Sequence, residues 1–210
     1  MNKHIETLIE RYPSLENSKA AILESFEIIN NAAMNHNKIL VCGNGGSSAD
    51  SDHIVGELMK SFVKKRPISN SIKEKIDLIA PNDSDMINNS LEDAIPAINL
   101  SQHSALNTAF SNDVNPNLIF AQQIIGYGNK DDILICISSS GSSKNVVFAS
   151  IVAKAKNMKV IGLTGEREGK VDKYCDVVIK VPEVETYKVQ ELHLPIYHTL
   201  CLMIEDSIWP

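Results

Sequence analysis

Short apolar runs alternate with amphipathic segments along most of the chain. The apolar runs have few polar residues inside them, which is typical of strands buried on both faces of a parallel sheet. They cover residues 38–43, 132–137, 159–164 and 176–181. Elsewhere apolar residues recur every three or four positions, which predicts helices. These segments are 15–35, 48–63, 118–127, 145–156 and 188–208. Strands that alternate with helices predict an α/β fold with a parallel sheet covered on both faces.

Two segments depart from this alternation. In residues 1–36, Pro13 separates a short helical start from the long helix, so we expect a helical extension that packs on the domain or on another subunit. Residues 64–91 contain KKRP and PNDSD and lack a long apolar period. This composition predicts an extended loop or lid, with a solvated insertion of no particular role as the alternative.

Composition narrows the classes of function. The chain has 210 residues, 43% hydrophobic and 22% charged, which suits one domain over 1–210. A net charge of -6 leaves no broad cationic surface, so we expect neither a nucleic-acid nor a membrane partner. Charges are scattered through the first 21 residues, which predicts no signal peptide and a cytoplasmic location. The cysteines lack paired metal or redox spacing and are predicted to be reduced core residues: Cys42, Cys136, Cys175 and Cys201.

Two turns rich in small polar residues carry the candidate chemistry. The sequence GNGGSS over 43–48 follows the first strand and opens a helix, where backbone N–H groups and the helix dipole favour an anion. It matches neither a P-loop nor a dinucleotide fingerprint. The sequence SSSGSS over 138–143 follows the second predicted strand. Both turns should meet at the carboxyl edge of the sheet, where many hydroxyls and few cations suit a singly phosphorylated sugar.

Four stretches carry a resemblance to a known family: CGNGGSSADSDHIVGE, SNDVNP, ISSSGSSKNVV and VQELHLPIYH. Together they resemble the sugar isomerase (SIS) domain, and more narrowly the phosphoheptose isomerases, over about residues 22–208. The resemblance implies a flavodoxin-like three-layer α/β/α sandwich, assembled as a homotetramer whose active sites are shared between subunits. Members of the family interconvert sedoheptulose 7-phosphate and glycero-manno-heptose 7-phosphate, so a heptose phosphate is the implied ligand.

The resemblance also implies a set of site residues. Its substrate contacts would come from both turns, from the SNDVNP stretch and from two helices: Asn44, Gly45, Gly46, Ser47, Glu57, Asn112, Asp113, Ser138, Ser139, Ser140, Ser143 and Gln190. Four of the five serines of the second turn, Ser138, Ser139, Ser140 and Ser143, would hold the phosphate. Its catalytic and zinc cluster would consist of His53, Glu57, Gln190 and His198. His103 and His193 match no catalytic position and are expected to be structural.

Helical spacing agrees with this cluster. His53 and Glu57 are four positions apart and share a helix face, and a histidine with a carboxylate can form half of a Zn²⁺ site. Gln190 and His198, eight apart, differ by about 80° around a helix. Glu191 lies seven positions before His198 and aligns with it more closely, so spacing alone leaves Glu191 as an alternative to Gln190.

Isomerisation through an enediol needs a base and an acid. The expected base is Glu57, and His198 would move a hydroxyl proton, because an imidazole titrates near neutral pH. A bound Zn²⁺ ion would polarise the carbonyl. Many phosphoheptose isomerases have an arginine four residues after this glutamate, but here that position is Ser61, beside Lys60. The segment 64–91 also looks longer than its counterpart, and a changed lid could admit another sugar phosphate.

Two other functions remain open from the sequence. One is a non-catalytic SIS-domain tetramer that binds a protein partner, like the DnaA initiator-associating protein. The other is a sensor that binds a sugar phosphate without turnover. The presence of all four cluster residues argues against the protein-binding tetramer, and the sensor stays open.

Overall fold

The structure is a computed structural model that describes residues 2–210. Within this range the strands form one five-stranded parallel sheet in the order β2-β1-β3-β4-β5. The strands are β1 (Ile39–Cys42), β2 (Ala97–Asn99), β3 (Ile133–Ser138), β4 (Lys159–Thr164) and β5 (Val177–Lys180). The four predicted strands are confirmed. Strand β2 was not predicted, because three residues are too few to show a period.

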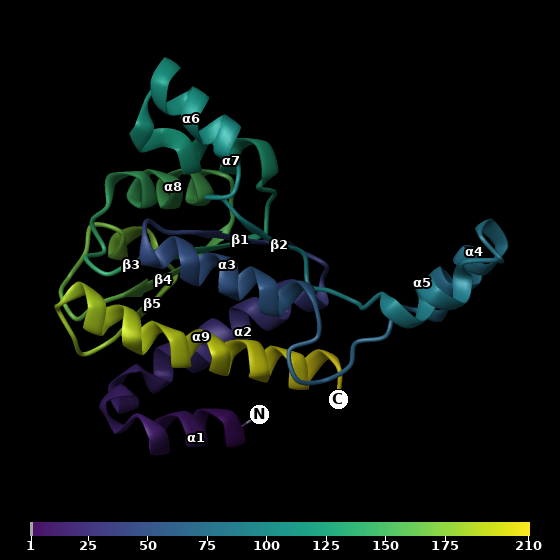
Figure 1. Cartoon of the computed structure of the whole chain (residues 1–210). Coiled ribbons are helices and arrows are strands. Elements are labelled where there is room, and N and C mark those ends of the chain that lie inside the picture. Colours follow the sequence, from purple (N-terminus) through teal and green to yellow (C-terminus); the bar gives the residue numbers. More distant parts are fainter. Residues whose placement is uncertain (1) are drawn as a thin grey trace.

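Helices cover both faces of the sheet (Figure 1). One face carries α1 (Asn2–Arg11), α2 (Lys19–Met34), α3 (Gly46–Met59) and α9 (Thr186–Ile208). The other carries α7 (Ile119–Tyr127) and α8 (Lys144–Ala155), with α6 (Ser104–Asp113) beyond α7. Short 3₁₀ turns span Pro13–Ser18, Pro116–Leu118 and Asp172–Tyr174. Successive strand residues point to opposite faces, so Ile133 and Ile135 join one core, and Leu134 and Cys136 the other. The α/β fold class is confirmed.

The N-terminal extension packs on its own domain. Helix α1 lies along α9, and Ile5 and Leu8 are buried in the core on this side. His4 Nε2 lies 2.8 Å from Asp206 Oδ2 at the far end of α9. The predicted helix over 15–35 begins later, at Lys19, because the 3₁₀ turn Pro13–Ser18 occupies its first residues.

The prediction of an extended loop over 64–91 was wrong. This segment forms two helices, α4 (Asn70–Ile79) and α5 (Ser84–Ser90), which project from the body of the molecule (Figure 1). We call residues 69–91 the arm. Ser69 caps α4 by accepting the N–H of Ile72, and Ile72, Ile76 and Ile79 repeat at helical spacing. The pattern was missed because the polar residues around these three isoleucines mask so short a period.

The cysteines form no disulfide bond among residues 2–210. All four cysteines are free; Cys42, Cys136 and Cys201 are buried, and Cys175 is half-buried. This fits the prediction of reduced core residues.

Among the helices of residues 2–210, we find none with the length and apolar character needed to cross a membrane.

Candidate active site

The first turn brings α9 over the start of α3. Gly45 has φ of +56°, a conformation that residues with a side chain rarely adopt. At Gly46 an added Cβ would lie 2.6 Å from Nε2 of Gln190. The two glycines therefore permit the tight turn and leave room for Gln190 against it. This places Gln190 against Gly46 at the start of α3.

The second turn gathers hydroxyl groups at the end of β3. Gly141 has φ of +59°, and a Cβ added there would lie 2.8 Å from the Cα of Gly169. This position therefore requires glycine. The Oγ atoms of Ser138 and Ser143 are 3.4 Å apart, and Ser140 Oγ accepts the N–H of Ser142. The turn therefore presents several hydroxyls at the N-terminal end of α8.

A pair of amides joins the two turns directly. Asn44 and Asn145 exchange reciprocal hydrogen bonds of 2.9 and 2.8 Å. This contact confirms that both turns meet at the carboxyl edge of the sheet. Asn145 was not among the predicted site residues, although its place directly after the serine turn could have indicated it.

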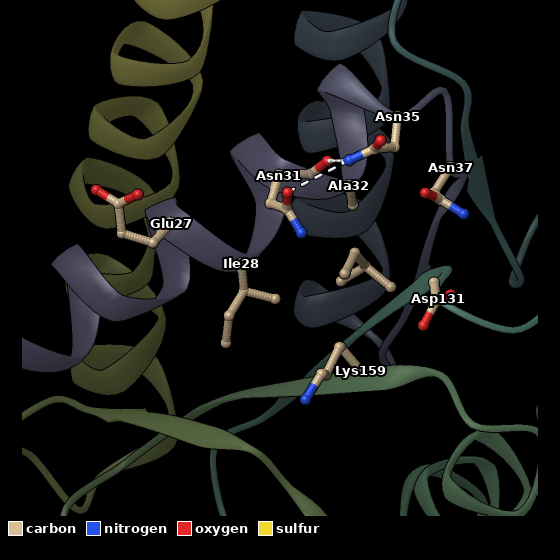
Figure 2. A pocket seen from close by; sticks show the side chains of 9 residues that line it. Glu27, Ile28, Asn31, Ala32, Asn35, Asn37, Asp131 and Lys159 are labelled. Atoms are coloured by element: carbon tan, nitrogen blue, oxygen red, sulfur yellow. Dashed lines mark hydrogen bonds between the residues drawn. The ribbon is translucent and has the colours of Figure 1, made fainter.

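Cavities lie at both edges of the sheet. At the carboxyl edge, a cavity of about 220 Å³ is lined by residues that include Asn44, Gly45, Ser48 and Asn107 of α6. A larger cavity of about 530 Å³ lies where the strands begin, beneath the C-terminal half of α2 (Figure 2). There Asn35 is hydrogen-bonded to Asn31. This larger cavity is remote from both turns, so size alone does not locate the active site.

Three predicted functional side chains meet between α3 and α9. His53 Nε2 lies 3.2 Å from Glu57 Oε1 and 3.3 Å from His198 Nε2. The side chain of Glu57 is 14% exposed, and its Oε2 is buried without a hydrogen-bond partner among residues 2–210. Burial lowers the pKa of His198, as does the neighbouring His53, while Glu57 opposes the shift. Glu191, the alternative left open by spacing, is exposed to solvent.

A tyrosine and an aspartate complete this cluster, and sequence reasoning missed both. The hydroxyl of Tyr197 donates to Asp50 Oδ1 at 3.2 Å and lies 3.1 Å from Nδ1 of His53. Burial raises the pKa of Tyr197, with the charge of Asp50 acting in the same direction. Burial also raises the pKa of Asp50. Asp50 lies three positions before His53 on α3, a spacing that could have revealed it.

A buried ion pair anchors the C-terminal end of α3 to α9. Arg66 is 1% exposed and donates to the main-chain oxygens of Glu57 and Leu58, at 3.0 and 2.9 Å. Its Nε also donates to Glu205 Oε1 at 2.8 Å. Burial by itself would raise the pKa of Glu205, but N–H donors from residues 62–64 and Arg66 lower it. The backbone that carries Glu57 is therefore held on the helix that carries His198.

Other predicted positions lie outside this cluster. Asn112 and Asp113 are exposed at the end of α6 and are bonded to each other at 2.9 Å. Among residues 2–210, no hydrogen bond or ion pair joins them to either turn. His103 contacts the hydroxyl of Tyr127 at 2.8 Å. His193 is fully buried, and burial lowers its pKa to about 4, so this ring is neutral.

Comparison with known proteins identifies the family. The profile of the SIS domain family matches residues 97–203. The phosphoheptose isomerase of Nitratiruptor is 39% identical over 84% of this chain and 80% of its own length, and that of Aneurinibacillus thermoaerophilus is 32% identical over 100% and 96%. The chain belongs to the phosphoheptose isomerase family of SIS-domain proteins. The solved phosphoheptose isomerase of Francisella tularensis has the same fold, with 30% identity and a TM-score of 0.77 over 98% of this chain and 96% of its own.

The structure does not complete the zinc site implied by the resemblance to phosphoheptose isomerases. His53, Glu57 and His198 are neighbours, but Gln190 lies against Gly46, about two helical turns from His53 along α3. Within residues 2–210, no group of three or more His, Cys, Asp and Glu side chains is arranged to hold a metal ion. The residues as placed do not fit a closed Zn²⁺ site, and zinc binding stays a prediction.

The position that is arginine in many phosphoheptose isomerases has a different structural role here. Ser61 bonds the carboxylate of Glu92 through both its N–H and its hydroxyl, at 2.9 and 2.7 Å. The neighbouring Lys60 places Nζ 3.7 Å from Glu57 Oε2. A cation is thus present near Glu57, but it comes from the residue before the predicted position.

Proposed function

We propose that this chain is an aldose–ketose isomerase that acts on a sugar phosphate. The preferred substrate is sedoheptulose 7-phosphate, converted to D-glycero-manno-heptose 7-phosphate. The observation that carries this proposal is the meeting of Glu57, His53 and His198 within 3.3 Å contacts between α3 and α9. The name and coverage of the relatives support the heptose, because the relative from Aneurinibacillus thermoaerophilus matches the whole chain.

The phosphate end of the substrate is assigned to the two turns. The serine hydroxyls of residues 138–143 and the N–H groups at the start of α8 can surround an anion without a cationic side chain. Asn44, Gly45, Gly46, Ser47 and Gln190 then face the sugar chain. These contacts with the phosphate hold the reacting carbons in position beside the catalytic groups. Binding energy from the phosphate end can therefore lower the activation barrier of the proton transfer.

The proton transfer is assigned to Glu57. Its carboxylate takes the proton from the carbon next to the carbonyl, and the C–H electron pair forms the enediol double bond. The carbonyl electron pair moves to oxygen, which takes a proton from His198. Glu57 then returns its proton to the former carbonyl carbon, while the hydroxyl on the first carbon gives its proton back to His198 and becomes the new carbonyl. All of these steps use only groups of the chain, and a correctly placed general acid or base contributes about 10²- to 10⁴-fold.

The assembly and the location belong to the same proposal. A homotetramer with shared active sites would explain why Asn112 and Asp113 lie apart from the turns within one chain, since a second subunit could present them. A cytoplasmic location is proposed together with it. Neither part is needed for the chemistry assigned to Glu57 and His198.

The first prediction concerns Glu57 and tests the function. The purified protein, with and without added zinc, is incubated with sedoheptulose 7-phosphate while the aldose product is followed by NMR. Glu57→Gln is expected to lower kcat by about 10²- to 10⁴-fold, because the amide cannot accept the proton. Glu191→Gln is the matched control and should leave kcat unchanged, since that side chain is exposed.

Three outcomes would contradict the proposal. Equal turnover by wild type and Glu57→Gln would remove Glu57 as the base. Sugar-phosphate binding by the folded wild-type protein without any product would favour the sensor, and capture of a protein partner without either would favour the adaptor.

A further inference from the structure

A pair of asparagines bridges the two turns at the switch point of the sheet. The strand order places β1 beside β3, while the helices α3 and α8 that follow them lie on opposite faces (Figure 1). Open α/β sheets bind their ligands where the chain changes face in this way. Asn44 follows β1, Asn145 lies in the first turn of α8, and their carboxamides exchange hydrogen bonds of 2.9 and 2.8 Å. The pair therefore lies where this fold is expected to bind a ligand.

The backbone of α8 fixes the orientation of both carboxamides. Asn145 Oδ1 accepts the N–H of Val146 at 3.0 Å. This N–H is one of the first donors of the helix, which have no acceptor inside it, so an oxygen and not an NH₂ group must face it. Asn145 therefore presents Oδ1 as an acceptor and Nδ2 as a donor to its partner. Asn44 must then donate from its own Nδ2 and accept at its own Oδ1.

Of the two residues, Asn44 lines the cavity at the carboxyl edge and Asn145 does not. Asn44 is exposed and contributes to the cavity of about 220 Å³, whereas Asn145 is half-buried. A carboxamide has two N–H groups and two lone pairs on its oxygen. The pair uses one N–H and one lone pair of Asn44, so among residues 2–210 the other N–H and lone pair stay available. One donor and one acceptor together suit a hydroxyl group.

We propose that Asn145 is a positioning residue that fixes the side-chain amide of Asn44 for a hydroxyl group of the sugar phosphate. This rests on the proposed function, in which Asn44 faces the sugar chain. Asn145 acts through Asn44 and does not itself contact the substrate. An unrestrained asparagine loses rotamer freedom when it binds a ligand, and this loss weakens binding. The contact with Asn145 orders Asn44 before the sugar arrives.

The contact also fixes the position of Asn44 relative to the phosphate end of the site. Asn145 lies two positions after Ser143, the last of the serines assigned to the phosphate. Asn44 belongs to the turn assigned to the sugar, and the amide pair joins the two turns through side chains. A hydroxyl group at the matching distance from the phosphate can bind Asn44, whereas one of inverted configuration points elsewhere. Asn145 therefore contributes to the choice of sugar.

The first experiment observes the pair without substrate. The protein is labelled with ¹⁵N, and the side-chain amide signals of Asn44 and Asn145 are assigned by their loss in Asn44→Ala and Asn145→Leu. In wild type we expect a nuclear Overhauser effect between the two carboxamides. Asn145→Leu keeps the approximate size of the side chain and suits a helix. In this variant the Asn44 amide should become mobile and exchange its protons with solvent faster than in wild type.

The second experiment measures KM and kcat with sedoheptulose 7-phosphate. Asn145→Leu should raise KM by about 3- to 10-fold, the value of one neutral hydrogen bond. The kcat should stay nearly unchanged, because the contact is made equally in the ground state and the transition state. Asn44→Ala should raise KM at least as much. The double variant Asn44→Ala/Asn145→Leu should match Asn44→Ala alone, since Asn145 acts only through Asn44.

A matched control comes from the other asparagine pair. Asn35→Leu removes the side-chain hydrogen bonds to Asn31 in the cavity where the strands begin. It should change neither KM nor the Asn44 signals.

The outcomes separate this inference from the proposed function. A wild-type Asn44 amide as mobile as in Asn145→Leu would overturn the inference, as would an unchanged KM in that variant. Additive rises in KM in the double variant would show that Asn145 acts independently of Asn44, which would also overturn it. If wild type shows the ordered pair but neither converts nor binds sedoheptulose 7-phosphate, the proposed function is rejected, while the orientation of Asn44 by Asn145 stands.

Discussion

We compare the contact between α3 and α9, called the seam, with the arm formed by α4 and α5. Apolar and charged side chains are buried in the seam, whereas apolar side chains are exposed on the arm. In the seam, Leu58 is 2% exposed and a buried arginine satisfies the last carbonyls of α3. In the arm, α4 has no buried residue, and Leu78 is 85% exposed. In the seam, His53 Nε2 lies within 3.3 Å of both Glu57 Oε1 and His198 Nε2. In the arm, α4 forms without any buried residue. Close packing is therefore found where the candidate acid and base lie and is absent from α4 of the arm.

The strongest test of this comparison removes the buried anchor. Arg66→Met should lower the free energy of unfolding by about 3–5 kcal/mol, because it leaves the carboxylate of Glu205 buried without its cation. The double variant Arg66→Met/Glu205→Met removes both charges and should recover part of this loss. Denaturant unfolding at pH 7 measures both. A single variant as stable as the double one would show that the ion pair does not hold the seam.

A matched pair of leucines compares the two regions directly. Leu58→Ala should lower the free energy of unfolding by about 2–5 kcal/mol, because it leaves a cavity in the core beneath α3. Leu78→Ala should change it by less than about 0.5 kcal/mol, because the side chain is exposed on the arm. Thermal or denaturant unfolding of the two variants checks this. Equal losses would mean that the arm is packed against something in solution.

The smallest expected effect is on the pH dependence of stability, through Asp206 near the C-terminal end of α9. Lys64, His4 and Lys3 hold the pKa of Asp206 well below its usual range. A lowered folded-state pKa stabilises the protein above the unfolded value of about 4, and this contribution is lost as the pH falls below it. Asp206→Asn should therefore lower Tm at pH 7 and narrow the fall in Tm between pH 7 and pH 3. A fall as steep as in wild type would exclude Asp206 as its source.

The sequence was informative where a period or a motif is local. The strands 39–42, 133–138, 159–164 and 177–180 each lie in a continuous apolar run, so their burial could be read directly. Helix spacing also placed His53 and Glu57 on one face. The helices of the arm and α6 were missed, because neither α4 nor α6 buries a residue and their apolar periods are correspondingly weak.

The contacts that complete the candidate site were hidden for another reason. Tyr197 meets Asp50 across 147 positions, and Arg66 meets Glu205 across 139. No local pattern couples residues so far apart, and a tyrosine on an apolar helix face is usually a core residue. The reciprocal amides of Asn44 and Asn145 are separated by 101 positions and were missed in the same way.

The sequence by itself determined the α/β class, the two turns at the carboxyl edge and the family, because each depends on residues that are close along the chain. The tertiary structure decided which side chains surround His53, how the C-terminal end of α3 is held, and that Gln190 rather than Glu191 faces the turn. These depend on how α3 and α9 pack, since a helix fixes its own faces but not the partner that each face meets.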